Sequence, residues 1–122
     1  MRGGKKMIGE ETEMHLHEAV VSEHESCVSN HGYFKNHHEA YGVIKEEMEE
    51  VLDASELFAG RAMQNLDSLW LKIKEDDMDN EVGEHIMPIY DTANELAREC
   101  IQVMAVCKKW MRLINKEREE VE

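Results

Sequence analysis

From Ile89 onward, hydrophobic residues recur at alternating steps of four and three residues over about 26 positions. This spacing follows one face of an α-helix and suits packing in a bundle or across a subunit interface. Pro88 is expected at or just inside the start of this helix, where its missing N–H costs no hydrogen bond. The stripe predicts one long C-terminal helix and consists of Ile89, Ala93, Leu96, Cys100, Val103, Cys107, Trp110 and Ile114.

Helical patterns also precede this segment. Residues 10–30 carry a thin apolar stripe, and Gly32 is expected to stop that helix. Asn36 can cap the next helix, with Glu39 three residues later as its capping-box partner. The second helix then carries apolar residues at helical spacing, at positions 41, 44, 48, 51, 52 and 58.

Gly60 is expected to weaken or end the second helix, so that residues 61–74 form a third one. No convincing strand pattern appears. We therefore predict an all-α four-helix bundle over residues 10–116, with a frayed start at 1–9 and a charged tail at 117–122.

Composition limits what this chain can do. Its 122 residues fit one domain, and 42% hydrophobic residues with a single proline indicate a globular helical protein. The formal net charge of −13 argues against a nucleic-acid polymer as partner, although a divalent cation could bridge the chain to phosphates. No apolar run is long enough for a membrane helix, and no secretory signal is seen. The three cysteines are interpreted as reduced thiols of a cytoplasmic protein.

An acidic run, KEEMEEVLDA at residues 45–54, becomes informative once helix phase is applied. At about 100° per residue, Glu47 and Glu50 border the apolar stripe on one side, as a pair that can share a ligand. Glu46 lies one row further out, and Glu49 faces away from the stripe. The acids of this run are therefore not equivalent.

The last helix repeats this arrangement, because Glu99 and Gln102 border the same side of its stripe. If the two stripes pack antiparallel, the two polar rows meet at the edge of the seam. Oxygen ligands from two helices, completed by water, suit Mg²⁺. The alternative interpretation is the ordinary polar flank of an amphipathic helix.

The segments HHEAYGVIKEEMEEVLDA and ELARECIQVMAVCKKW resemble the two metal-binding helices of the MazG-like all-α nucleoside triphosphate pyrophosphohydrolases, and most closely the short proteins of phages and Gram-positive bacteria. The family signature is EExxE followed downstream by ExxD. Glu46, Glu47 and Glu50 match the first motif, and Glu99 matches the glutamate of the second. Gln102 stands where the family has aspartate, and Glu95, one turn earlier, is our candidate for supplying the missing charge.

The resemblance implies hydrolysis of a (d)NTP between the α and β phosphates, giving the monophosphate and pyrophosphate. It implies Mg²⁺, for which Mn²⁺ can substitute, and a homodimer or homotetramer. The expected metal ligands are Glu47, Glu50, Glu99, Gln102 and Glu95. Glu46 and Glu47 are the expected catalytic residues, and His38, Lys45, Lys72 and Trp70 the candidate substrate contacts.

Two further interpretations stay open at this point. Gln102 allows a catalytically weak or inactive protein on the same scaffold, which binds nucleotide or a protein partner. His24, Cys27 and His31 share one helix face and could offer ligands to Zn²⁺, although no fourth ligand is evident.

Overall fold

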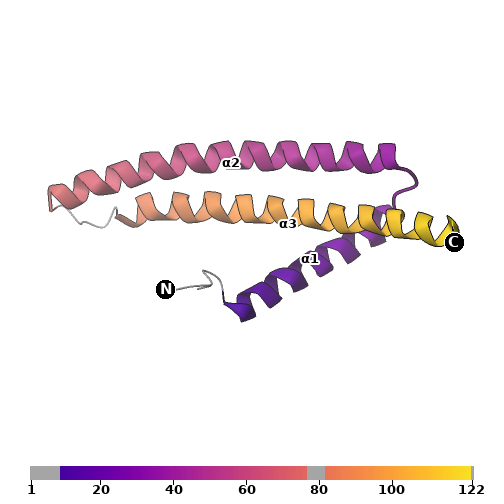
Figure 1. Ribbon diagram of the computed structural model, residues 1–122. Helices are drawn as coiled ribbons and strands as arrows, with labels where there is room; N and C mark the ends of the chain where they lie inside the picture. The colour runs from indigo at the N-terminus through magenta and orange to yellow at the C-terminus, as the bar shows by residue number, and fades with distance from the viewer. Residues whose placement is uncertain (1–8, 77–81, 122) are drawn as a thin grey trace, which may run out of the picture. The chain divides into compact units, whose positions relative to one another are not determined.

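The computed structural model describes residues 9–76 and 82–121, which form three helices (Figure 1). These are α1, Glu10–His31, α2, His37–Lys74, and α3, Val82–Val121. The described residues contain no strand, which confirms the all-α prediction for that part of the chain. None of the described helices is long and apolar enough to cross a lipid bilayer.

The predicted helix break at Gly60 is wrong, because α2 continues through it to Lys74. The described residues therefore form three helices where we expected four. Glycine inside a helix costs only about 1 kcal/mol relative to alanine. The long runs of good helix formers on both sides of Gly60 outweigh that cost.

The local signals between α1 and α2 are confirmed. Gly32 follows the last residue of α1 with φ at 74°, and its N–H donates to the Val28 carbonyl at 2.7 Å. The Glu39 N–H donates to Asn36 Oδ1 at 2.8 Å, and the Lys35 N–H donates to Glu39 Oε1 at 2.9 Å. Both helix ends thus satisfy backbone groups that the helix itself leaves unpaired.

The start of α3 differs from the prediction. The helix begins at Val82, so Pro88 lies inside it rather than at its first turn. Nearby, the Thr92 hydroxyl donates to the Pro88 carbonyl at 2.7 Å, which holds the side chain against its own backbone. At the other end α3 continues to Val121, so residues 117–121 of the expected tail are helical.

The chain forms two compact units. Unit 1 comprises the residues up to Ile44 and those from Ile101 onward; unit 2 comprises Lys45–Cys100. In unit 1, the buried side chains of Phe34, Ala40 and Val106 form a small core. The half-buried hydrophobic residues packed against this core are Val43, Ile44, Trp110 and Leu113.

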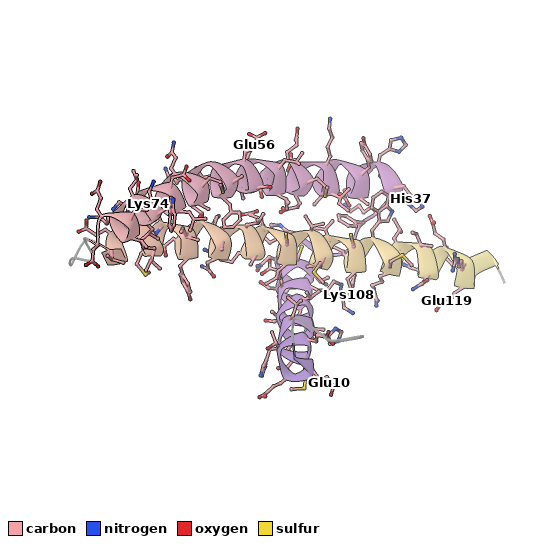
Figure 2. The ribbon with its side chains drawn as sticks, turned by 60° about the vertical axis from the view of Figure 1, so that its left-hand side comes forward. Glu10, His37, Glu56, Lys74, Lys108 and Glu119 are labelled. Carbon is pink, nitrogen blue, oxygen red and sulfur yellow. The ribbon has the colours of Figure 1, made fainter. Side chains whose placement is uncertain are left out.

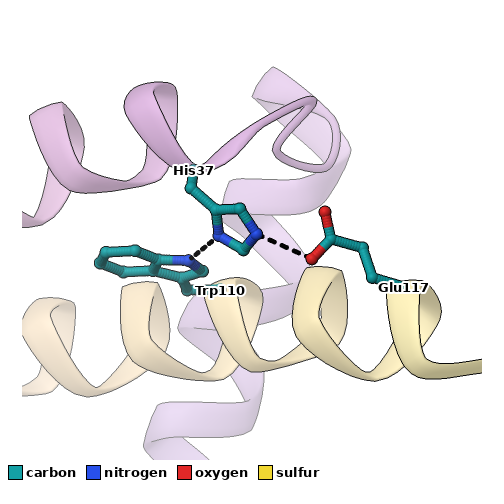
Figure 3. Close-up of polar contacts among 3 residues, drawn as sticks. All are labelled: His37, Trp110 and Glu117. Carbon is teal, nitrogen blue, oxygen red and sulfur yellow. Dashed lines mark hydrogen bonds and ion pairs between the residues drawn. The ribbon is translucent and has the colours of Figure 1, made fainter.

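Unit 1 also contains a chain of polar contacts between α2 and α3 (Figure 3). The Trp110 indole N–H donates to His37 Nδ1 at 2.9 Å, and His37 Nε2 lies 2.7 Å from Glu117 Oε1. The imidazole therefore joins two side chains that lie seven residues apart on α3. These bonds position the first turn of α2 against α3.

In unit 2, the α2 and α3 segments run antiparallel, side by side (Figure 1). Along each whole helix, the buried and half-buried residues recur at alternating four- and three-residue steps. We call these two rows the seam. It contains Ala40, Ile44, Glu47, Val51, Ala54 and Phe58 on α2, and Thr92, Leu96, Glu99, Val103, Val106, Trp110 and Leu113 on α3.

The seam corrects both predicted stripes. On α3, every second residue of the seam lies one position before the residue that the predicted stripe contains. Ala93, Cys100 and Cys107 of that stripe are exposed. On α2, hydrophobic spacing predicted that Tyr41, Met48 and Leu52 belong to the core. These three residues are exposed as well. Glu47 and Glu99 consequently lie within the seam rather than along its edge.

Candidate functional site

Three glutamates of unit 2 lie together where α2 and α3 pack. Glu47 and Glu50 lie one turn apart on α2, and Glu99 comes from α3. One carboxylate oxygen of each lies within 4.8 Å of the others. These three residues, which we call the carboxylate cluster, are the three glutamates that helix phase and the resemblance both selected as metal ligands.

The position of the cluster in the seam removes two of its oxygens from water. Glu47 and Glu99 are half-buried, whereas Glu50 is exposed. Glu47 Oε2 and Glu99 Oε2 are buried atoms without a hydrogen-bond partner. Such atoms are costly unless a proton or a cation compensates for the lost hydration.

The electrostatics of the cluster show this cost. Burial, followed by repulsion from Glu50, raises the pKa of Glu47 from 4.5 to about 7. A hydrogen bond with Glu50, formed when a proton is shared between the two carboxyls, acts in the same direction, as do the charges of Glu99 and Glu46. Glu47 is therefore poised to gain or lose a proton near neutral pH.

Glu99 behaves in the same way from the opposite helix. Burial raises the pKa of Glu99, and so do its hydrogen bond with Glu50 and the negative charges of Glu50 and Glu95. Both seam carboxyls are thus held in conditions that disfavour their charged forms. A bound cation would reverse this preference, because an opposite charge nearby favours ionisation.

The donor set fits a hard divalent cation. Its three groups are carboxylates, which are the oxygen ligands that Mg²⁺ and Mn²⁺ prefer. Two of the three residues carry an orphaned buried oxygen. Solvent at exposed Glu50 leaves room for the water ligands that Mg²⁺ usually keeps.

The remaining predicted acidic and amide residues lie around this cluster. Glu46 is exposed and acts on the cluster through its charge, which contributes to the raised pKa of Glu47. Glu95 is exposed, and Arg98 Nη1 donates to its Oε2 at 3.4 Å. Gln102 is half-buried on α3 and belongs to unit 1, so its role as a ligand stays a prediction.

The predicted substrate contacts are spread along α2. Lys45 is exposed, about 160° around the helix from Glu47. Trp70 and Lys72 follow Glu50 on the same helix by 20 and 22 residues, which corresponds to about 30 Å of helical rise. Trp70 is 55% exposed and lies beneath the Lys74 ammonium, 5.7 Å from the ring centroid.

Neither Trp70 nor Lys72 can therefore contact a nucleotide held by the carboxylate cluster of the same chain. A role for them at the substrate would require a second copy. His38 is exposed in the first turn of α2, within unit 1, and its role stays a prediction.

The ligand atoms of His24, Cys27 and His31 on α1 do not converge on one point. Among the described residues, the carboxylate cluster is the one group of three or more acidic, histidine or cysteine side chains with convergent ligand atoms. The Cys27 thiol is instead 3.8 Å from Lys109 Nζ, which donates to it. Lys109 itself is almost fully buried, a placement that the sequence pattern did not indicate.

The chain was also compared with known proteins. No protein-family profile, no curated protein and no solved structure matches it. Its functional assignment therefore depends on the carboxylate cluster and on the motif resemblance.

Proposed function

We propose that this chain is a Mg²⁺-dependent nucleotide pyrophosphohydrolase of the MazG-like type, which cleaves a (d)NTP between the α and β phosphates. The observation that carries the proposal is the carboxylate cluster. It unites three carboxylates from two helices within 4.8 Å and leaves two buried oxygens without partners. The spacing of the same residues matches EExxE and the glutamate of ExxD.

The residues in and around the cluster would have different roles in catalysis. Glu47, Glu50 and Glu99 would hold the cation, which supplies charge neutralisation, polarisation of the phosphoryl oxygens and activation of water. Glu46 at the exposed side, or Glu47, would accept a proton from the attacking water. Because the cluster itself consists of carboxylates, a polyphosphate substrate at this site needs a bridging cation that offsets their repulsion.

Gln102 supports a second candidate function. An amide oxygen can coordinate Mg²⁺ but brings no charge, so the site would hold metal more weakly than one with aspartate. The alternative is a catalytically weak or inactive helical protein that binds nucleotide or a protein partner. Turnover separates the two candidates, because both retain the cluster.

Metal binding is tested first, by titrating Mn²⁺ into the protein and counting free ions by electron paramagnetic resonance. We expect one ion per chain in the wild type and at least tenfold weaker binding in Glu47→Gln and Glu50→Gln. Glu56→Gln is the matched control, because Glu56 lies on α2 and points away from α3 (Figure 2). Equal binding in all four proteins would remove the cluster as the site.

Catalysis is tested by pyrophosphate release from a panel of dNTPs with Mg²⁺ or Mn²⁺. Activity that is lost in Glu47→Gln and kept in Glu56→Gln supports the pyrophosphohydrolase. Metal binding without any turnover at micromolar enzyme favours the alternative function. Gln102→Asp is then expected to tighten metal binding and to increase or restore turnover.

We also propose that a second copy of the chain covers unit 2. Among the described residues of this unit, Ala54 and Thr92 are the buried ones. Eleven large hydrophobic side chains remain 43–66% exposed, namely Met48, Leu52, Leu57, Met63, Leu66, Trp70, Leu71, Ile73, Ile86, Met87 and Tyr90. Spread over more than one side of α2, they leave roughly 1,000 Å² of apolar surface in total, against the about 800 Å² per partner of a standard interface. Two such helix pairs would make a four-helix bundle.

A further inference from the structure

Unit 1 contains a cavity of about 510 Å³ whose lining differs in charge from the rest of the molecule. Its cationic residues are Lys35, from the segment between α1 and α2, and Lys109, Arg112 and Lys116, from α3. Tyr33 and Phe34 contribute aromatic rings. We call this cavity the basic pocket. It gathers four positive side chains in a chain with a formal charge of −13.

Two of the four cations of the basic pocket contact aromatic rings. Lys109 Nζ lies 4.2 Å from the Phe34 ring centroid, and the Arg112 guanidinium lies 4.0 Å from that of Tyr33. Within the described part of the chain, Lys109, Arg112 and Lys116 have no carboxylate oxygen within 4.0 Å. Their charges are therefore available to a ligand.

Lys109 is the decisive member, because its side chain is only 4% exposed. Its one hydrogen bond goes to Cys27 Sγ, a weak acceptor that brings no charge while the thiol is protonated. A buried ammonium without an anionic partner is strongly disfavoured, and an anion in the pocket would supply that partner.

Two acidic residues, Glu117 and Glu120, also line the pocket, so its four cations outnumber its carboxylates by two. Glu117 accepts a hydrogen bond from His37 (Figure 3), and Glu120 is exposed near the end of α3. A second hollow, of about 640 Å³, shares Arg112 and Lys116 and adds one further cation, Lys108, and one acidic residue, Glu119. Lys108 extends from α3 on the side of α1 (Figure 2).

The positive field reaches α1 as well. Burial lowers the pKa of His24, and the positive charges of Lys108, Arg112 and Lys109 lower it further, against an opposing effect of Glu25. His24 lines the second hollow and carries a buried Nε2 without a hydrogen-bond partner. It can therefore offer the hollow a neutral polar atom beside the cations.

We propose that the basic pocket binds the phosphate chain of a small polyphosphate anion without requiring a divalent cation. A planar guanidinium and three ammonium groups converge on one cavity, which is the combination that recognises phosphate oxygens. The volume lies within the range of small-ligand sites, and the acidic exterior excludes long polyanions. This site belongs to unit 1 and shares no residue with the carboxylate cluster.

The test is isothermal titration of inorganic tripolyphosphate into the full chain, in EDTA at low salt. Because EDTA removes divalent cations, failure here is distinguishable from failure of the metal-dependent activity. We expect micromolar binding that weakens as salt is added. Arg112→Gln is expected to weaken binding at least fivefold, and Arg118→Gln, on the same helix but lining neither hollow, to leave it unchanged.

Lys109→Met keeps an unbranched apolar side chain as far as Cε and removes the ammonium group. We expect at least tenfold weaker binding with a melting temperature that is unchanged or higher, because an unpaired buried charge is lost. A parallel titration with ATP shows whether the source is a nucleotide: tighter binding than tripolyphosphate indicates base contacts at Tyr33, and equal binding indicates recognition of the phosphate chain alone. Absence of binding at millimolar anion, or equal losses in Arg112→Gln and Arg118→Gln, overturns the proposal.

Discussion

Glu47 and Glu99 occupy seam positions that a hydrophobic residue fills in an ordinary pair of packed helices. Their neighbours along each seam are residues such as Val51 and Leu96, which contribute to stability by burial. A carboxylate at the same place loses hydration and gains little packing. The chain therefore gives up stability at the positions that its proposed function needs.

The raised carboxyl pKa values predict an unusual dependence of stability on pH. Since folded Glu47 has a pKa of about 7 against 4.5, the folded state binds more protons between these values. The stabilising contribution is complete below pH 4.5 and disappears as pH rises through 7. In EDTA, the free energy of unfolding by urea should fall by roughly 1 kcal/mol from pH 5 to pH 8, after allowing for solvent screening.

Glu47→Gln provides the control for this decline, because an amide does not titrate. Its unfolding free energy should change less across the same pH range. Saturating Mg²⁺ should restore much of the stability of the wild type at pH 8, since binding to the folded state alone stabilises it. A wild-type curve as flat as that of Glu47→Gln would contradict the assignment of the titrating group.

Replacing the second seam carboxylate by a hydrophobic residue should separate stability from metal binding. Glu99→Leu is expected to raise the unfolding free energy in EDTA by roughly 1–2 kcal/mol, because it replaces an orphaned carboxylate with apolar contacts. The same variant should lose Mn²⁺ binding. The unfolding free energy of Glu56→Leu, a surface change on α2, should stay within about 0.5 kcal/mol of the wild type. A gain in Glu56→Leu as large as that in Glu99→Leu would show that any glutamate-to-leucine change stabilises the protein, whether or not the residue lies in the seam.

At the scale of the helices, local signals were predictable and long-range ones were not. Gly32 and the Asn36–Glu39 pair act on backbone groups within a few residues, so sequence alone locates both helix ends correctly. Whether a helix ends at Gly60 or begins at Pro88 depends on whether packing outweighs local propensity. Both of these predictions are wrong, because α2 continues through Gly60 and α3 begins before Pro88. Propensity is a weak guide where a long helix is held by its neighbour.

Because α2 continues through Gly60, a substitution that favours the helix at this position should stabilise the protein. A Cβ at this position would meet no atom within 4 Å beyond its chain neighbours and the backbone of its own helix. Gly60→Ala should therefore raise the free energy of unfolding by roughly 0.5–1 kcal/mol, through reduced entropy of the unfolded chain. Gly32→Ala is the opposite case, because its φ of 74° strains any side chain, and it should destabilise by roughly 1 kcal/mol. Urea unfolding of both variants checks the pair.

The register of the α3 seam shows a further limit of sequence reading. Two adjacent rows of this helix are apolar enough to pack against α2. One row passes through Ala93 and Cys100, and the other through Thr92 and Val106. The spacing of hydrophobic residues predicts the first row, and the second contains Glu99. The structure uses the second, so the residue that made the row look polar is the one that the packing places at the site.

At the scale of the whole molecule, the exposed apolar face of unit 2 predicts self-association. Leu66→Glu places a charge within that face and should convert the wild-type oligomer to a monomer in sedimentation velocity. Glu56→Lys also changes the charge on α2, at a residue that points away from α3 (Figure 2), and should leave the association unchanged. A wild type that sediments as a monomer at tens of micromolar would contradict the second-copy proposal.

The candidate site was predictable to the extent that it follows helix phase. Phase separated Glu47 and Glu50 from Glu49 and found Glu99 on the partner helix. The basic pocket was not predicted, because its walls come from two segments more than 70 residues apart. Its lysines look like ordinary surface charges, and only the spacing of Lys109, Arg112 and Lys116 on one face of α3 could have drawn attention to them.

The bond between Trp110 and His37 gives the protein a built-in optical probe. The indole N–H needs an acceptor at Nδ1, so neutral His37 carries its proton on Nε2 and directs it to Glu117. Separation of the first turn of α2 from α3 removes this acceptor from the indole. Trp110 emission should therefore report the docking of the first turn of α2 on α3 without any attached dye, once the second tryptophan is removed as Trp70→Phe.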